Sequence, residues 1–459
     1  MPLPSSRLFT RLLTTLLLSL SLLCLCTPAF AQPISEQEKK EILAKAEKLV
    51  REEAYAAGTD FGRWDDHLKK FRERLDAADT APRFSSVVNQ MLSEFGISHL
   101  DILSPAAAKQ IEGSTFSGIG VSLTPLRRDG SGAHQIQLVL ENSPAQKAGL
   151  KVGDVILSAD GKPLTDTSLL RGPTGSVVKV EVQNDDGTTR IIDITRGRVS
   201  FREPELLVDL DDDTALIRIP TFHSDYDRRN VNALMRRAMN KKRLIIDLRF
   251  NGGGEVRNML HFLGLMLPRG QVIGTSVSRE QAQEFARTTG GDADDVVAVA
   301  EWVQEKMRIA RNDVGPYKGQ VVVLINRFSA SASEIVAQSL VELKGAITVG
   351  TPTAGAVLVS SYERLPNGFQ MKVPHSEYVS IKGRRLEGKP LEPDHTVRGG
   401  EGLLNSPRAA GNATPSADEL RTKAKNDRAV KVALDKLNEL EGQVHENKPK
   451  PNEQPADKR

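Results

Sequence analysis

Three serines stand where a buried strand is expected to lead into a helix. The stretch NRFSASASEIV, residues 326–336, follows the apolar run VVVLI and contains Ser329, Ser331 and Ser333. An apolar run followed by helix-forming residues predicts a strand-to-helix junction. A serine at such a junction is a candidate nucleophile, but its hydroxyl attacks well only when a base takes its proton. These residues therefore suggest acyl-transfer chemistry and require a base from elsewhere in the chain.

A glycine turn could provide the second part of such a site. Residues 252–254 are consecutive glycines that end the buried-strand pattern RLIIDLRF. Glycine lets the backbone turn sharply and present N–H groups. The start of a helix also offers free amides, and its dipole favours a developing oxyanion. The two stretches together predict an oxyanion hole, whereas a plain glycine turn and an N-capping serine are the alternative.

Residues 113–198 alternate short strands with glycine and aspartate turns, which is typical of a compact mixed domain. Within them, ENSPAQKAGLKVGDVILSADGKPL resembles the most recognisable stretch of PDZ domains. PDZ domains bind a chain end by strand addition and hold its carboxylate with loop amides. The resemblance assigns those amides to Gly118, Ile119 and Gly120. The alternative is a PDZ-like domain that only gates the active site or packs against it.

DLRFNGGG followed by RFSASASEI, behind a PDZ-like domain, resembles the carboxyl-terminal processing proteases. That family has an α/β serine protease core with a PDZ domain. The resemblance implies that Ser331 is the nucleophile and that Ser329 and Ser333 are structural. It also implies that the amide of Ala332 pairs with that of Gly253 as the oxyanion hole.

The lysine that serves as base in that family is missing here. It belongs to a TFGKG motif, twenty-five residues after the serine, and the matching stretch TPTAGAVLV has Ala356 in its place. Alanine cannot accept a proton. Lys372, Lys382 and Lys389 follow, but they lie outside the motif. The chain is therefore either an inactive protease fold or an enzyme with another base.

The related tricorn-like proteases use a Ser-His/Ser/Glu arrangement in place of Ser-Lys. Their motifs match FGISHLDIL, which contains Ser98 and His99, and LEGKPLEPD, in which Glu387 stands seven residues before Asp394. The resemblance implies that His99 accepts the proton of Ser331 while Glu387 and Ser98 orient the imidazole, as the third member of a triad does. An imidazole with an ordinary pKa near 6.5 predicts activity that falls below about pH 6 to 7.

Two functions follow from these readings. One is an exported serine endopeptidase that cleaves polypeptides, with processing at carboxyl ends as the family's activity. The other is a catalytically inactive protease fold that binds peptides or proteins through its PDZ-like domain. No metal or organic cofactor is implied, since the acid clusters DLDDDT and GDADDVV lack the ligand spacing of a calcium loop. Lys and Arg number 62 against 59 Asp and Glu, so no nucleic-acid partner is indicated, and the oligomeric state stays unknown.

The strands and helices expected to position these residues alternate along the chain, and this pattern predicts a mixed α/β fold. Residues 1–31 read as a signal peptide, with two arginines, an apolar stretch and Ala29-Phe30-Ala31, and both cysteines lie inside it. The apolar stretch is too short for a comfortable membrane span, so we expect no stable span in the mature chain and a periplasmic or secreted location. The remaining segments are expected to be an N-terminal helical segment (32–112), the PDZ-like domain (113–198), the protease core (199–402), and a C-terminal helix with a disordered tail (403–459). Residues 275–315 read as a polar insertion, either a lid or a surface cover.

Overall fold

The computed structural model describes residues 33–111, 115–126, 133–140, 143–164, 167–184, 187–200, 204–310, 312, 314–398 and 416–446. The expected signal peptide and the expected disordered tail beyond residue 446 lie outside these ranges. Within them, no helix combines the length and the apolar character needed to cross a bilayer.

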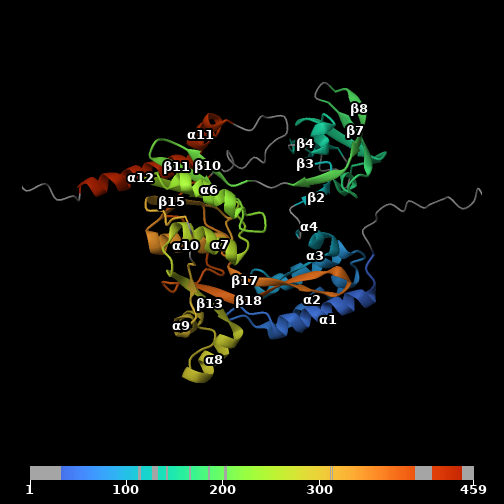
Figure 1. The fold of residues 1–459 in the computed structure, drawn as a ribbon. Coiled ribbons are helices and arrows are strands. Elements are labelled where there is room, and N and C mark those ends of the chain that lie inside the picture. Colours follow the sequence, from blue (N-terminus) through green and yellow to red (C-terminus); the bar gives the residue numbers. More distant parts are fainter. Residues whose placement is uncertain are drawn as a thin grey trace, which may run out of the picture.

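The mixed α/β fold is confirmed, and its centre is a mainly parallel sheet (Figure 1). Its strands, in spatial order, are β10 (Leu206–Asp209), β11 (Thr214–Arg218), β12 (Arg243–Asp247), β15 (Gln320–Ile325), β16 (Ile347–Gly350) and β19 (His395–Thr396). β10 is antiparallel to β11, and the other pairs are parallel. Every residue of β11 is buried, as expected for a strand covered on both faces. Because β12 and β15 are parallel neighbours, the glycine turn and the serine loop that follow them lie side by side.

Helices cover both faces of this main sheet. On one face are α6 (Arg228–Ala238), α7 (Val256–Met266) and α10 (Ala332–Lys344), packed on residues such as Ile217 and Ile246. On the other are α11 (Ala417–Asn426) and α12 (Arg428–Glu446), with Val430 and Leu437 of α12 packed on Ile245 and its neighbours. The sequence predicted one C-terminal helix and missed α11. α11 carries few apolar residues and instead begins with a capping box at Ser416.

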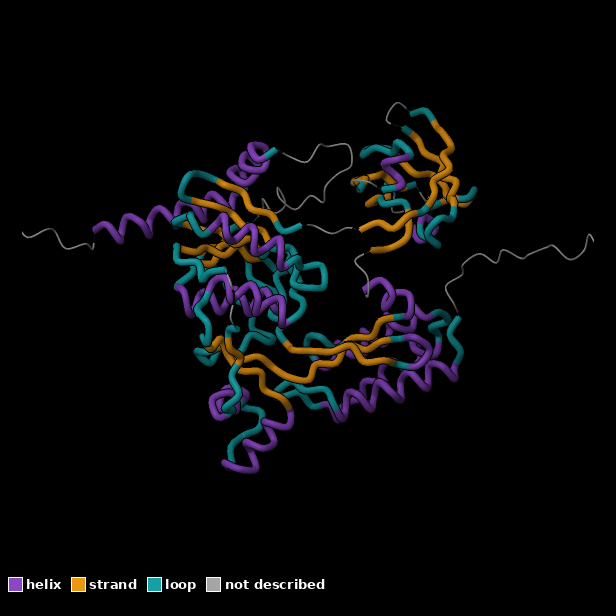
Figure 2. The backbone as a smooth tube through the Cα atoms, in the orientation of Figure 1, coloured by secondary structure: helices purple, strands orange, loops and turns teal. Residues whose placement is uncertain are grey.

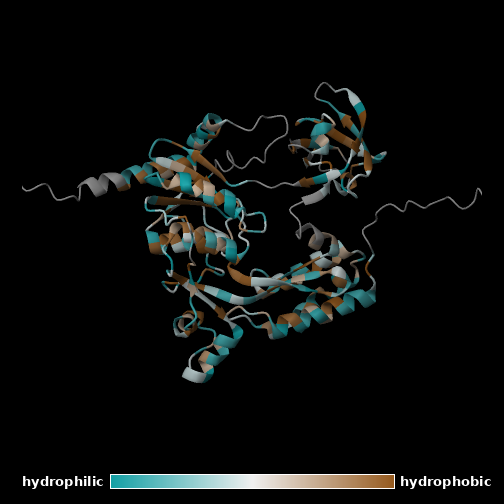
Figure 3. Cartoon of the chain, viewed as in Figure 1, coloured by the Kyte–Doolittle hydropathy of each residue, from teal (hydrophilic) through white to brown (hydrophobic). Residues whose placement is uncertain are grey.

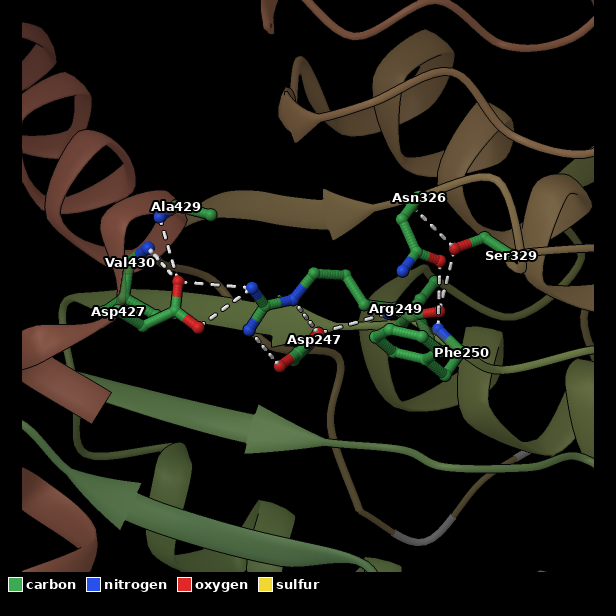
Figure 4. A network of polar contacts seen from close by, with 9 residues as sticks. Asp247, Arg249, Phe250, Asn326, Ser329, Asp427, Ala429 and Val430 are labelled. Carbon is green, nitrogen blue, oxygen red and sulfur yellow. Dashed lines mark hydrogen bonds and ion pairs between the residues drawn. The ribbon is translucent and has the colours of Figure 1, made fainter. Parts of the chain in front are cut away.

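A buried ion-pair network fastens these C-terminal helices to the sheet (Figure 4). Arg249 lies 2.8 Å from Asp247 and 2.9 Å from Asp427, and the three side chains are at most 2% exposed. Asp427 also accepts hydrogen bonds from the amides of Ala429 and Val430, so it caps the start of α12. One carboxylate therefore joins the C-terminal helix to the loop that leads into the glycine turn.

The N-terminal segment contributes to a second sheet and is not an independent helical unit. This sheet has the order β1 (Asp101–Leu103), β18 (Gln370–Ser380), β13 (Val272–Ser278) and β14 (Met307–Arg308), and β17 (Leu358–Arg364) pairs with β18. Asp101 pairs with Lys372 and Ile102 with Met371. The sequence missed β1 because a three-residue strand has too little pattern to be recognised. Through this pairing the SH dipeptide is brought to the protease core.

The N-terminal helices cover one face of the second sheet (Figure 2). They are α1 (Glu36–Glu52), α2 (Trp64–Asp76) and α3 (Ala81–Leu92), with the 3₁₀ turns η1 (Phe61–Arg63) and η2 (Ser93–Phe95) and the short α4 (Pro105–Ile111). Hydrophobic and hydrophilic residues alternate along α1 (Figure 3), and its apolar face packs with Ile102, Met371 and Val373. Side chains alternate along a strand, so Asp101 and Lys372 face the opposite side.

The described residues between 275 and 315 include the end of β13, two helices and β14. α8 (Arg279–Thr289) begins with a capping box at Ser278, and α9 (Val296–Trp302) packs its apolar residues with Tyr55 and Val379. This segment therefore forms a surface cover over one end of the second sheet.

The expected PDZ-like domain forms a separate lobe (Figure 1). Its elements are β2 (Thr115–Gly118), β3 (Val121–Pro125), β4 (His134–Val139), α5 (Pro144–Lys147), β5 (Val155–Ala159), β6 (Lys162–Pro163), η3 (Thr167–Leu170), β7 (Val177–Gln183), β8 (Thr189–Thr195) and β9 (Gly197–Ser200). β2 and β9 pair with each other at the point where the chain enters and leaves the lobe. The lobe has its own core, which includes Ile136, Ile156 and Val180.

Candidate active site

Ser331 is held in a strained backbone conformation at the junction between β15 and α10. It is the residue before the helix, with φ 57° and ψ −121°. A positive φ is costly for a residue with a side chain, and such strain gathers at functional sites. The Ser331 amide donates to the carbonyl of Ala356 at 2.9 Å, which helps to fix this conformation.

The two flanking serines, Ser329 and Ser333, bond to backbone carbonyls. The Ser329 hydroxyl donates to the Leu248 carbonyl at 2.9 Å, and the Ser333 hydroxyl donates to the Asn251 carbonyl at 2.8 Å. Both side chains are fully buried. They tie the serine loop to the glycine turn, which is the structural role expected of them, and Ser331 is the serine of this motif that lines a cavity.

The glycine turn lies against the candidate nucleophile. A Cβ added to Gly253 would lie 2.7 Å from the Ser331 Cβ, and one added to Gly254 would lie 2.1 Å from the backbone of Phe222. Only glycine therefore fits at either position. The Gly253 amide donates to the Asn251 side chain at 2.9 Å, and Gly252 and Gly254 are the glycines that line the cavity. The Ala332 amide opens α10, where it has no carbonyl of the helix to bond.

A chain of hydrogen bonds links Glu387, Ser98 and His99. The Ser98 hydroxyl lies 2.6 Å from His99 Nδ1 and donates to Glu387 Oε2 at 2.9 Å. A carboxylate only accepts and a hydroxyl carries one proton, so Nδ1 of His99 must be the donor to Ser98. The neutral imidazole then has Nε2 unprotonated, which is the form that can accept a proton.

Glu387 also fixes this chain to the nucleophile side of the site. It accepts from the Ser98 amide at 2.8 Å and from the Val357 amide at 2.8 Å, and it is 7% exposed. His99 has φ 59°, a second strained residue that these contacts hold in place.

One cavity of about 260 Å³ is lined by both Ser331 and His99. Ala332 and Val357 line it too, while Ser98 and Glu387 stand behind His99. Ser331 and His99, which lie more than two hundred residues apart in the sequence, therefore line the same cavity.

Two physical effects lower the pKa of His99 to about 3. Desolvation in the cavity wall is the larger, and the positive charge of Lys372 is the second. The imidazole therefore stays neutral down to far lower pH than an imidazole with the ordinary pKa near 6.5.

Glu334 is a residue of the site that belongs to the serine motif and has no role predicted from sequence. Its buried carboxylate accepts from the Ser331 amide at 3.1 Å, the Gly355 amide at 2.9 Å and the Ala356 amide at 3.0 Å. Burial raises its pKa, and these hydrogen bonds oppose the rise. Glu334 thus clamps the stretch that lacks the lysine onto the nucleophile.

Lys372 and His223 also line the cavity, and neither was placed in the site from sequence. Lys372 had been noted as lying outside the lysine motif. Its place in the cavity depends on the β1–β18–β17 pairing, in which Asp101 and Tyr362 are its neighbours. Local sequence contains no sign of this pairing.

The PDZ-like lobe has its own cavity, of about 240 Å³, beside the expected carboxylate loop. Ile119 and Gly120 line it together with Thr167 and Arg171, and Gly118 lies in the adjoining strand β2. Gly120 has φ 85°, and an added Cβ would lie 2.5 Å from that of Ser143. The loop conformation therefore requires glycine at this position.

Comparison with known proteins identifies two regions of the chain. Residues 213–397 match peptidase family S41, and residues 135–184 match a PDZ domain. The chain is 28% identical over 328 residues to carboxyl-terminal-processing peptidase 1, chloroplastic, of Arabidopsis thaliana, covering 67% of this chain and 61% of that relative. It is 23% identical over 374 residues to the carboxy-terminal-processing protease of Bartonella bacilliformis, covering 78% and 79% of the two chains.

Among solved structures, a photosystem II D1 C-terminal processing protease aligns with a TM-score of 0.42 and 22% identity, over 79% of this chain and 94% of that one. The chain spans less than two thirds of the length of the Arabidopsis relative. The S41 region contains both β12 with its glycine turn and the serine loop before α10, and the PDZ region lies within the separate lobe. Residues 213–397 therefore match peptidase family S41, and the PDZ match at residues 135–184 lies ahead of that region.

Proposed function

We propose that the protein is a serine endopeptidase that cleaves polypeptides through an acyl-enzyme on Ser331. The Ser331 Oγ attacks the carbonyl carbon of the scissile peptide bond, and its proton passes to Nε2 of His99. The tetrahedral intermediate collapses when Nε2 returns the proton to the leaving amine. A water then attacks the acyl-enzyme by the same route and releases Ser331. The observation that carries this proposal is the shared cavity, with Glu387, Ser98 and His99 linked behind it.

The oxyanion of each tetrahedral intermediate would be held by backbone amides. Ala332 at the start of α10 supplies one, where the helix dipole also favours negative charge. Gly253 supplies the second, provided that its amide exchanges the Asn251 oxygen for the oxyanion. That exchange would make the oxyanion hole complete only when substrate is bound.

The proposed substrate and location rest on other parts of the chain. We infer export to a periplasm or the exterior from the signal pattern of residues 1–31. The PDZ loop, with Gly118, Ile119 and Gly120, would hold a polypeptide carboxyl terminus by strand addition. Such capture would direct cleavage towards carboxyl ends, as the names of the relatives describe for those proteins.

A serine-reactive fluorophosphonate tests the central claim. The mature chain should be labelled at one site, and the label should disappear in Ser331→Ala but persist in Ser333→Ala when that variant is folded. Circular dichroism of each variant supplies the folding control. Failure to label the folded wild-type chain between pH 5 and 9 would contradict the proposal.

The second candidate is a catalytically inactive protease fold that binds peptides through its PDZ domain. Two observations favour it: Ala356 stands at the lysine position, and the Gly253 amide is already bonded. An inactive binder would not react with fluorophosphonate, but it would still bind peptides with free carboxyl ends.

The pH dependence of kcat/KM should differ from that of an ordinary histidine enzyme. Since the folded-state pKa of His99 is about 3, we expect kcat/KM at pH 5 to stay near its neutral value. An imidazole with a pKa near 6.5 would lose about 30-fold there. The earlier expectation of a fall below about pH 6 to 7 is revised accordingly.

This profile must be measured with the fraction folded checked at each pH. The unfolded chain binds a proton at His99 below about pH 6.5 and the folded chain does not, so folding stability declines from there towards pH 3. A fall in kcat/KM near pH 6.5 while the chain stays folded would contradict the prediction.

A further inference from the structure

Lys372 is a cation in the cavity wall that the proposed mechanism does not use. It lines the cavity together with Ser331 and His99, and desolvation lowers its pKa. No ion pair or side-chain hydrogen bond of the described residues involves Lys372, but the charge of Asp101, its neighbour across the strands, opposes the fall in its pKa. Withdrawing an ammonium from water without a hydrogen-bonded acceptor costs free energy, and such groups gather at functional sites.

The strand beside Lys372 offers a path for a polypeptide. β17 pairs with β18 and with no other strand of the described chain, so no described strand takes the backbone donors and acceptors along its outer edge. Leu358, Val359 and Ser360 of β17 line the cavity. A segment added along this edge would present alternate side chains to the face that carries Lys372 and Tyr362, which are opposite each other in the register.

We propose that Lys372 is a specificity-determining residue that binds a carboxylate of the polypeptide substrate close to the scissile bond. This inference rests on the proposed function, because it places the substrate in the cavity of Ser331. The carboxylate could be an Asp or Glu side chain or the end of the chain itself. Its oxygens would accept the ammonium protons that no described residue takes.

Carboxylate binding would also act on the base. The ammonium is one of the two causes of the low pKa of His99, so a bound carboxylate would offset it and make the imidazole a stronger base. The other charged or titratable groups nearby are Glu387 behind Ser98, Glu255 and His223 in the cavity wall, Tyr362, and Asp101 beside Lys372. Lys372 would therefore bind an acidic substrate, and the bound carboxylate would at the same time make His99 a stronger base.

Paired peptides test this directly. Fluorogenic peptides that differ only by Glu or Gln at each position around the scissile bond, each with a free or an amidated carboxyl end, are compared by kcat/KM. We expect the best acidic peptide to exceed its neutral partner by on the order of 10-fold. Lys372→Met should bring that ratio to about 1, and Lys372→Glu should invert it. Lys382→Met, an exposed lysine just after β18, should keep the wild-type ratio.

Each outcome has a distinct meaning. A Glu preference supports a side-chain carboxylate, and a preference for the free end alone supports a terminal one. An acidic preference that survives in folded Lys372→Met overturns the proposal. So does loss of all cleavage in Lys372→Met while a His99 variant remains active, since lysine would then be the base. If the wild type cleaves no peptide, the proposed function fails. Calorimetric binding of Glu and Gln peptides to wild type and Lys372→Met then tests separately whether Lys372 binds a carboxylate.

Discussion

Replacing His99 with asparagine should lower kcat/KM by about 10³-fold, the usual contribution of a positioned general base. Asparagine is chosen because it tolerates the positive φ of this position and cannot take up a proton at neutral pH. The Ser331 hydroxyl would then have no acceptor for its proton, while the cavity and the oxyanion amides would remain. Steady-state hydrolysis of a fluorogenic peptide at pH 7 provides the measurement.

The matched control is His375→Asn, an exposed histidine on β18 that does not line the cavity. It should retain wild-type kcat/KM. Activity of folded His99→Asn within a few-fold of wild type would show that the base lies elsewhere, and the assignment of Ser98 and Glu387 as the groups that orient it would then be abandoned.

Replacing Asp427 should cost the fold about 3 kcal/mol or more, although it lies outside the cavity of Ser331 and His99. In Asp427→Asn the guanidinium of Arg249 keeps Asp247 but loses a second buried partner, and breaking a buried pair costs about 3–5 kcal/mol. Asparagine still caps a helix well, so Asp427→Ala should cost about 1 kcal/mol more through loss of the cap. Urea unfolding followed by circular dichroism measures both values.

Asp435→Ala, an exposed aspartate on α12, is the matched control and should change stability by less than about 0.5 kcal/mol. Equal stabilities for the asparagine variant and the wild type would mean that Asp427 contributes only as a cap. The ion-pair account of Figure 4 would then be wrong.

The sequence predicts the parts of this protein that depend on local pattern. The buried strands of the main sheet appear as apolar runs because both faces are covered, and Gly254 appears as part of a glycine run because no Cβ fits there. Ser331 could be singled out by resemblance, and the structure adds why its neighbours cannot compete: their hydroxyls are committed to carbonyls.

What the sequence could not predict depends on pairing between distant strands. Lys372 enters the cavity because β18 pairs with β1 and β17, and no periodicity within β18 reveals its partners. The low pKa of His99 follows from the same arrangement, since it needs both burial and the charge of Lys372. The bond from Gly253 to Asn251 is likewise set by side-chain geometry within the turn.

The 289-residue separation between Ser98 and Glu387 has a consequence for biosynthesis. Under the proposed mechanism, a growing polypeptide carries Ser331 before Glu387, the carboxylate that would orient the imidazole, has left the ribosome. The pairing of β1 with β18 closes late for the same reason, because such distant contacts form only after the intervening chain is available. Under that mechanism, a chain that ends before Glu387 would lack the group that orients its base, so peptide hydrolysis would begin only after Glu387 has been added.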